Sequence, residues 1–265
     1  MELYSIASGS SGNCIYVGDN QSGLLVDVGI SMKRIREGLI QQELDFDQVE
    51  GIVITHEHSD HISGLGPILR KYQIPVYATE GTIRYILDSG KMKNVDTDLF
   101  CVVEPDRSVK VADMEVTPFS ISHDATDPVC YTIEKQQKKV SVATDMGTYS
   151  DYTVSHIKDS DAMLLEANHD INMLQVGSYP YSLKMRILGD RGHLSNDRSA
   201  HLIENVLHDK LQYVMLGHLS QENNLPELAY QTVKYELEQL EQWKDIGAKL
   251  SVASRKEPSA VVTIN

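Results

Sequence analysis

Short apolar and β-branched runs, separated by clusters of Gly, Ser and Asn, dominate the first part of this chain and predict strands joined by turns. Strands are predicted at 3–7, 14–17, 24–28, 51–54, 76–78, 129–134, 139–143, 162–166, 213–217, 252–253 and 261–264, with further candidates in 100–122. Apolar residues three to five apart predict helices at 32–42, 62–72, 196–208 and 226–242. Helices mixed with strands from end to end indicate a layered α/β fold, expected to be one domain over 1–265.

Composition narrows the class of protein. The 265 residues are 41% hydrophobic and 23% charged, which suits a globular chain with a sizeable core. No apolar run is long enough to cross a membrane, and no secretory signal is recognisable. Three widely spaced cysteines favour a reducing cytoplasm. The net charge of −14 argues against a protein that coats nucleic acid, although it allows an enzyme with a local basic patch.

The strongest chemical signal is the segment 55–61, THEHSDH, placed between a predicted strand and a predicted helix. His56, His58, Asp60 and His61 offer imidazole and carboxylate ligands of the kind that zinc and other first-row metals prefer. One turn cannot saturate two ions, so further ligands are expected at other strand ends. Three candidates each follow a strand-like run: His123, Asp145 and His218.

This ordered set, preceded by Asp27, resembles the motif series of the metallo-β-lactamase superfamily over about residues 24–220. The resemblance implies a metallo-β-lactamase fold, a four-layer αββα sandwich of two similar halves with metals at the strand ends. It implies two divalent ions, zinc or manganese, one held by His56, His58 and His123 and the other by Asp60, His61 and His218. Asp145 would bridge the ions, and Asp27 would orient a ligand loop.

Two later segments are similar to elements of tRNase Z-like phosphodiesterases: Glu166-Ala167 and Gly192-His193-Leu194-Ser195. That resemblance nominates His193 as the proton donor to the leaving oxygen, beside Asp60 as the other catalytic candidate. Those enzymes carry a supporting glutamate three residues before the bridging aspartate. Here that position is Val142, so Glu166 or His169 is expected to support His193.

Substrate contacts are expected from a flexible polar loop and from a basic cluster. Asn13, in SGSSGNC, is expected to reach a substrate oxygen near the metals. Residues 184–198 hold four basic and two acidic side chains, a local charge of +2. A phosphate-holding edge is therefore predicted there, formed by Lys184, Arg186, Arg191 and the helix N-cap Ser195.

As a whole, the chain is similar to the YycJ/WalJ group of bacterial proteins, through the segments SGSSGNC, THEHSDH, SISHDA, ATDMG, LLEANHD, GHLSN and LGHLSQENN. This resemblance implies a cytoplasmic metal-dependent nuclease with 5′→3′ exonuclease activity on double-stranded DNA and a role in repair. The alternatives are a small-molecule acyl, thioester or lactone hydrolase, a di-iron redox enzyme and a non-catalytic DNA-binding regulator. The residues leave open DNA or RNA, end or internal cleavage, polarity, the metal and the oligomeric state.

Overall fold

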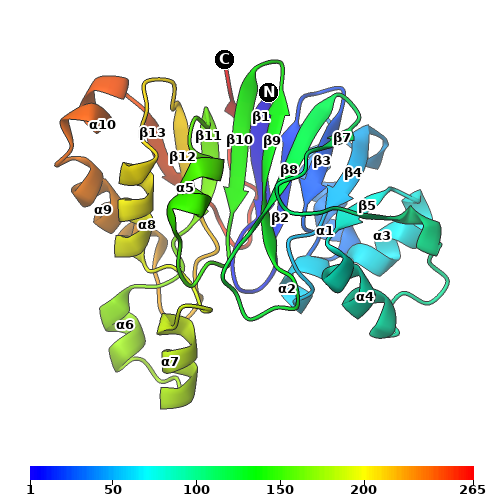
Figure 1. Ribbon diagram of the computed structural model, residues 1–265, viewed down its shortest axis with the longest axis horizontal. Coiled ribbons are helices and arrows are strands. Elements are labelled where there is room, and N and C mark those ends of the chain that lie inside the picture. The colour runs from blue at the N-terminus through cyan, green and yellow to red at the C-terminus, as the bar shows by residue number, and fades with distance from the viewer.

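Two seven-stranded sheets pack face to face in the computed structural model, which describes residues 1–265 (Figure 1). The first sheet has the order β14 (Val262–Thr263), β1 (Glu2–Ala7), β2 (Cys14–Gly18), β3 (Gly23–Val26), β4 (Val49–Val53), β5 (Val76–Ala78) and β6 (Phe100–Val102). The second sheet has the order β13 (Lys249–Val252), β12 (Tyr213–Gly217), β11 (Ala162–Glu166), β10 (Lys138–Ala143), β9 (Val129–Lys135), β8 (Met114–Ser120) and β7 (Val109–Val111).

Both sheets are mixed, and their parallel strands require crossover connections, which the helices provide. The first sheet is connected through α1 (Met32–Ile40), α2 (Ser59–Ile62), α3 (Leu65–Tyr72) and α4 (Glu80–Asp88). The second sheet is connected through α5 (Asp151–Ile157), α6 (Ile171–Val176), α7 (Tyr181–Leu188), α8 (Asn196–Asn205), α9 (Pro226–Leu237) and α10 (Glu241–Ile246). Two short 3-10 turns lie at Phe46–Gln48 and Thr97–Leu99. None of the helices is long and apolar enough to cross a membrane.

Three apolar clusters separate the layers. Inward-facing side chains of both sheets, such as Val26 and Leu164, form the central cluster. A second cluster joins the first sheet to α1, α3 and α4, for example through Leu39 and Ile68. A third joins the second sheet to α8, α9 and α10, and contains Ile203. The four-layer αββα sandwich expected from the sequence is therefore confirmed.

Two of the predicted helices are each interrupted, so those predictions were wrong in extent. The helix expected over 62–72 begins later, as α3, and only its first residue belongs to α2, because Gly64 donates its N–H to Val28 O and lies close to the backbone there. A Cβ at Gly64 would lie 2.3 Å from Ile30 O. The helix expected over 226–242 ends at Leu237, and α10 follows with Trp243 buried in the third cluster. Helices α4 to α7 were not predicted at all.

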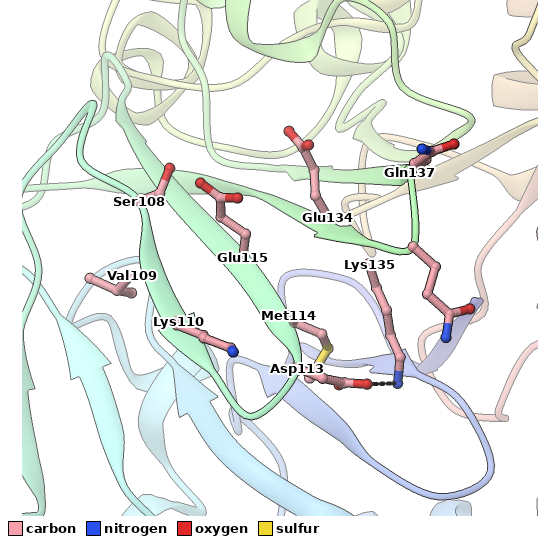
Figure 2. Close-up of a pocket in the computed structure, with 10 residues that line it drawn as sticks. Ser108, Val109, Lys110, Asp113, Met114, Glu115, Glu134, Lys135 and Gln137 are labelled. Atoms are coloured by element: carbon pink, nitrogen blue, oxygen red, sulfur yellow. Dashed lines mark ion pairs between the residues drawn. The ribbon is translucent and has the colours of Figure 1, made fainter.

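At the edge of the sandwich opposite α2, the ammonium of a buried lysine forms ion pairs with two aspartates. The ammonium of Lys135, in the β9–β10 hairpin, lies 2.6 Å from Asp19 Oδ2 and 2.9 Å from Asp113 Oδ2. Asp19 follows β2 in the first sheet, whereas Asp113 lies in the β7–β8 turn of the second. Figure 2 shows this lysine beside the pocket that the two hairpins line. The ion pairs thus connect the two sheets far from the candidate metal ligands.

Candidate metal centre

The candidate ligands follow β4, β8, β10 and β12, on loops or, for Asp60 and His61, within the short helix α2, at the edge where α2 is found in Figure 1. Two of them, Asp145 (φ 62°) and His218 (φ 53°), have left-handed backbone conformations, and so does Asp27 (φ 59°). Such conformations are uncommon for residues other than glycine and cluster at functional sites. They turn the chain sharply after the strand and direct these side chains toward the space between the sheets.

Three histidines form one candidate ligand group. His56 Nε2 lies 3.0 Å from His58 Nδ1, which lies 3.3 Å from His123 Nε2. The far nitrogens of two rings have partners: Thr55 Oγ1 lies 3.0 Å from His56 Nδ1, and Gly192 O lies 3.2 Å from His123 Nδ1. Each ring thus directs one nitrogen to a common point, as required for shared coordination of a cation.

A second candidate group consists of one carboxylate and two histidines. Asp60 Oδ2 lies 3.5 Å from His61 Nε2 and 3.6 Å from His218 Nε2. Asp145 lies between the two groups, with Oδ2 3.3 Å from His61 Nε2 and Oδ1 3.8 Å from His123 Nε2. The structure therefore brings together all seven residues that the sequence nominated, with Asp145 placed to contact both groups.

The chemistry of these residues fits bound metal cations. Asp145 Oδ2 and His218 Nε2 are buried and have no hydrogen-bond partner, a costly state that a bound ion would relieve. Burial, together with the neighbouring rings, lowers the pKa of His56, so that ring is uncharged, the form that a metal ligand requires. Burial also opposes protonation of His218, but Asp145 and other carboxylates outweigh it and raise its pKa. The second group therefore attracts positive charge, either protons or a metal ion.

Two carboxylates orient the histidines of the second group by contacting the ring nitrogens that face away from Asp60. Asp27 Oδ2 lies 2.7 Å from His61 Nδ1, and the same side chain accepts hydrogen bonds from the N–H and hydroxyl of Thr55. Glu166 Oε1 lies 2.9 Å from His218 Nδ1. In each case the carboxylate is placed to accept from Nδ1–H, and Nε2 faces the Asp60 carboxylate on the other side of the ring.

His193 shares the Glu166 carboxylate with His218. Its Nδ1 lies 2.8 Å from Glu166 Oε1, and its side chain is 19% exposed at the rim of the centre. Glu166 itself is fully buried and also accepts from the N–H groups of Met146 and Leu194. Burial alone raises its pKa, but His193 and His218 outweigh burial and hold the pKa well below its usual range. The ionised Glu166 is thus placed to support an imidazolium at His193.

Three other predicted site residues are buried among protein groups. Asn13 Oδ1 accepts from Gly9 N, and Ser195 caps α8 by accepting from Arg198 N. Asn13 Nδ2 also lies 3.2 Å from His61 Nε2, so this side chain lies beside the candidate ligands, and substrate binding by Asn13 and Ser195 stays a prediction. His169 makes no hydrogen bond to His193: both of its ring nitrogens are buried without partners, and burial lowers its pKa to about 4.

The basic side chains that were expected to hold phosphate lie on and after α7. Arg186 forms an ion pair with Asp124, and Arg191 Nε donates to His123 O at 3.1 Å. The ammonium of Lys184 donates to the carbonyls of Gln175 and Gly177, each at 2.7 Å. Two of these cations therefore lie beside the His123 loop, whereas Lys184 closes the turn between α6 and α7.

Sequence reasoning did not single out three residues that shape this centre. Thr55 connects Asp27 to the first ligand loop, and Asp124 connects His123 to α7. Gly29 lets the Asp60 loop approach closely, since a Cβ there would lie 1.6 Å from Asp60 O. The THEHSDH and SISHDA segments already contain Thr55 and Asp124, but their contacts are long-range and no spacing rule reveals them.

The fold and the ligand arrangement define a metallo-β-lactamase-fold protein. Residues 24–216 match the family model described as the β-lactamase superfamily domain, and the chain belongs to this family. It is 42% identical over 234 residues to exodeoxyribonuclease YycJ of Bacillus anthracis, covering 88% of each chain. It is 40% identical over 237 residues to exodeoxyribonuclease WalJ of Streptococcus pneumoniae, covering 89% of this chain and 88% of the relative.

Solved structures agree on the fold. The short form of human tRNase Z superposes with a TM-score of 0.68 at 15% identity, and 100% of each chain is covered. Yeast PDE1 superposes with a TM-score of 0.69 at 15% identity, covering 97% of this chain and 98% of that one. At such low identity the likeness establishes the shared architecture alone.

Proposed function

We propose that this chain is a metal-dependent exonuclease that removes nucleotides from double-stranded DNA in the 5′→3′ direction. The exodeoxyribonucleases of the preceding comparisons support the reaction class, because they match most of the chain. The observation that carries the proposal is the pairing of His193 with Glu166 beside the seven candidate ligands. Three unpaired cysteines fit the cytoplasmic location that such a substrate implies.

The seven ligands would hold two divalent ions, which supply charge stabilisation for a phosphate and acidify a bound water. Around them, the chain's own groups have separate tasks. Asp27 and Glu166 fix the rings of His61 and His218. His193, with its Nδ1–H held by Glu166, is left with Nε2 to deliver a proton to the departing oxygen. Arg186 and Arg191, at the rim, are placed to hold a flanking phosphate.

A small-molecule acyl hydrolase would require an enclosed and largely apolar pocket. Here the rim is polar and open: the side chain of Asp60 is 25% exposed and that of His193 is 19% exposed. An open, polar rim flanked by arginines suits the end of a charged polymer better than a small apolar ester.

Digestion of end-labelled single- and double-stranded DNA and RNA, with and without a 5′-phosphate, tests the proposal in protein loaded with zinc or manganese. We expect mononucleotides to be released first from the 5′ end of duplex DNA. Faster turnover of acyl esters or lactones than of any nucleic acid would contradict the proposal.

The role of His193 has its own test. His193→Ala is expected to slow DNA cleavage by about 100-fold or more, because the sugar oxygen needs a proton to leave. Hydrolysis of bis(p-nitrophenyl) phosphate is expected to fall much less, since nitrophenolate leaves unprotonated. Equal losses on both substrates would show that His193 does not donate this proton.

A further inference from the structure

An excursion of the chain lies against the candidate metal centre without supplying a ligand. Residues 171–192, which we call the α6–α7 arm, connect β11 to the loop before α8, and in Figure 1 they project beyond the edge of the sheets. Three contacts anchor the end of the arm to the His123 loop. Ser122 Oγ donates to Asp190 O at 2.6 Å, Arg191 donates to His123 O, and Arg186 forms an ion pair with Asp124. The arm is therefore attached to the loop that carries a ligand.

The arm exposes large apolar side chains to solvent. Val176 is 86% exposed, Tyr181 is 77% exposed and Met185 is 48% exposed. Tyr181 and Met185 are four residues apart in α7 and so share one face of the helix. The arm is less than a tenth of the chain, yet it holds three of its nine exposed large apolar side chains. Such a concentration is typical of an interaction surface.

The charge of the arm indicates which partner this surface accepts. Lys184, Arg186 and Arg191 outnumber its single acid, Asp190, so the arm carries +2 in a chain of −14. The remainder of the molecule therefore carries −16, so the arm is a positively charged segment in a chain that is acidic overall. Lys184 donates to the carbonyls of Gln175 and Gly177 and so ties together the turn between α6 and α7.

We propose that the α6–α7 arm is a nucleic-acid platform, on which the Tyr181 ring stacks against a base of the substrate strand. This inference rests on the proposed nuclease function and adds the place where the strand lies. Stacking on an aromatic ring tolerates every base, as an enzyme that digests a chain of any sequence requires. The arginines at the foot of the arm would hold the backbone between this base and the metal centre.

The test compares Tyr181→Ala and Tyr181→Trp with Tyr235→Ala in the metal-loaded protein. Tyr235 is 65% exposed on α9, outside the arm, and serves as the matched control. Removal of the Tyr181 ring is expected to raise KM for end-labelled DNA about tenfold, because one base loses its stacking partner. Tyr181→Trp is expected to keep a KM near the wild-type value, and Tyr235→Ala to leave it unchanged. A 2-aminopurine near the DNA end should be quenched by wild type and by Tyr181→Trp but not by Tyr181→Ala.

Two outcomes would overturn the platform. One is the same KM and quenching in Tyr181→Ala as in Tyr235→Ala. The other is a change of oligomeric mass in Tyr181→Ala on sedimentation, which would make the arm an interface between copies of this chain. If wild type digests DNA but Tyr181→Ala binds it equally well, only the platform fails. If wild type hydrolyses bis(p-nitrophenyl) phosphate but no nucleic acid, the proposed function fails as well.

Discussion

The two halves of this molecule have the same strand plan and different chemistry. In each sheet, three antiparallel pairings are followed by three parallel ones, so that β3 and β4 correspond to β10 and β11. In each half the strand before the first crossover helix leads into an aspartate with positive φ, Asp27 after β3 and Asp145 after β10. The backbone thus presents a carboxylate at equivalent places.

The difference between these two aspartates lies in what surrounds their oxygens. The Asp27 carboxylate contacts Thr55 and His61 through both oxygens, so it is already satisfied within the protein. Asp145 Oδ2 has no hydrogen-bond partner. The neighbouring side chains therefore decide whether the carboxylate at this backbone position is satisfied within the protein, as in Asp27, or has an oxygen left without a partner, as in Asp145.

The next strand shows the same contrast. The loop after β4 carries four candidate ligands within six residues, whereas β11 ends in Glu166, which contacts His193 and His218 from behind. The second half also inserts the α6–α7 arm before its next strand. The first half thus concentrates the ligands, and the second half supplies the bridging position, the proton donor and the substrate contacts that we propose.

The largest effect is expected from exchanging the two aspartates for asparagine. Asp145→Asn should abolish detectable DNA cleavage and two-metal occupancy together, because the unpartnered oxygen is lost. Asp27→Asn should retain both metals with affinity reduced about 10- to 100-fold, since only the orientation of His61 is weakened. Metal content by mass spectrometry and DNA digestion measure both. Equal metal loss in the two variants would remove the distinction between the halves.

Glu166→Gln should give the next largest effect. The amide is a poorer acceptor than the carboxylate for His193 and His218, so kcat on DNA is expected to fall about 100-fold. The kcat–pH profile should also shift, because the carboxylate no longer stabilises an imidazolium at His193. Glu134→Gln, at an exposed position of β9, is the control. An unchanged pH profile in Glu166→Gln would contradict the assigned role.

A smaller effect, on the pH dependence of the free energy of unfolding, is expected from the buried ring of His169. Its ring is held neutral down to a pKa of about 4, whereas an unfolded histidine binds a proton near pH 6.5. The unfolded state therefore binds more protons between these values, and stability falls as the pH falls through this range, by about 3 kcal/mol in all. His169→Phe should remove this part of the slope in urea unfolding with saturating metal. His201→Asn, on the surface of α8, should keep it. An unaltered slope in His169→Phe would refute the assignment.

Lys135→Met, at the far edge, should have the smallest effect. Its two ion pairs, of which Figure 2 shows the one with Asp113, reach partly exposed aspartates, so their loss is expected to cost about 1 kcal/mol. In a chain of this size that lowers the melting temperature by roughly 2–4 °C. DNA digestion should be unchanged, because no ligand lies at this edge. A large loss of activity would show that the two edges are coupled.

The local pattern of apolar and polar residues was sufficient to predict many of the strands. Runs such as 14–17 and 162–166 became β2 and β11, because apolar and β-branched side chains suit strands buried on both faces. Helices α6 and α7 escaped prediction because they are short and exposed, so their side chains show no clear apolar stripe. The end of α9 at Leu237 was also not predicted, since the start of a separate helix α10 accompanies the burial of Trp243 in the third cluster.

The sequence by itself nominated the candidate ligands, their order and their association with strand ends, because imidazoles and carboxylates gathered in one short turn are typical of a metal site. Only the tertiary structure decided that the Asp145 carboxylate faces the other candidate ligands, whereas the Asp27 carboxylate contacts the Nδ1 atom of His61. It also showed that Asn13 contacts both the backbone of Gly9 and the ring of His61, that Ser195 caps α8, and that the α6–α7 arm lies beside the His123 loop. These outcomes depend on contacts between residues far apart in the chain. Because such contacts form only when the chain folds, no local sequence pattern predicts them.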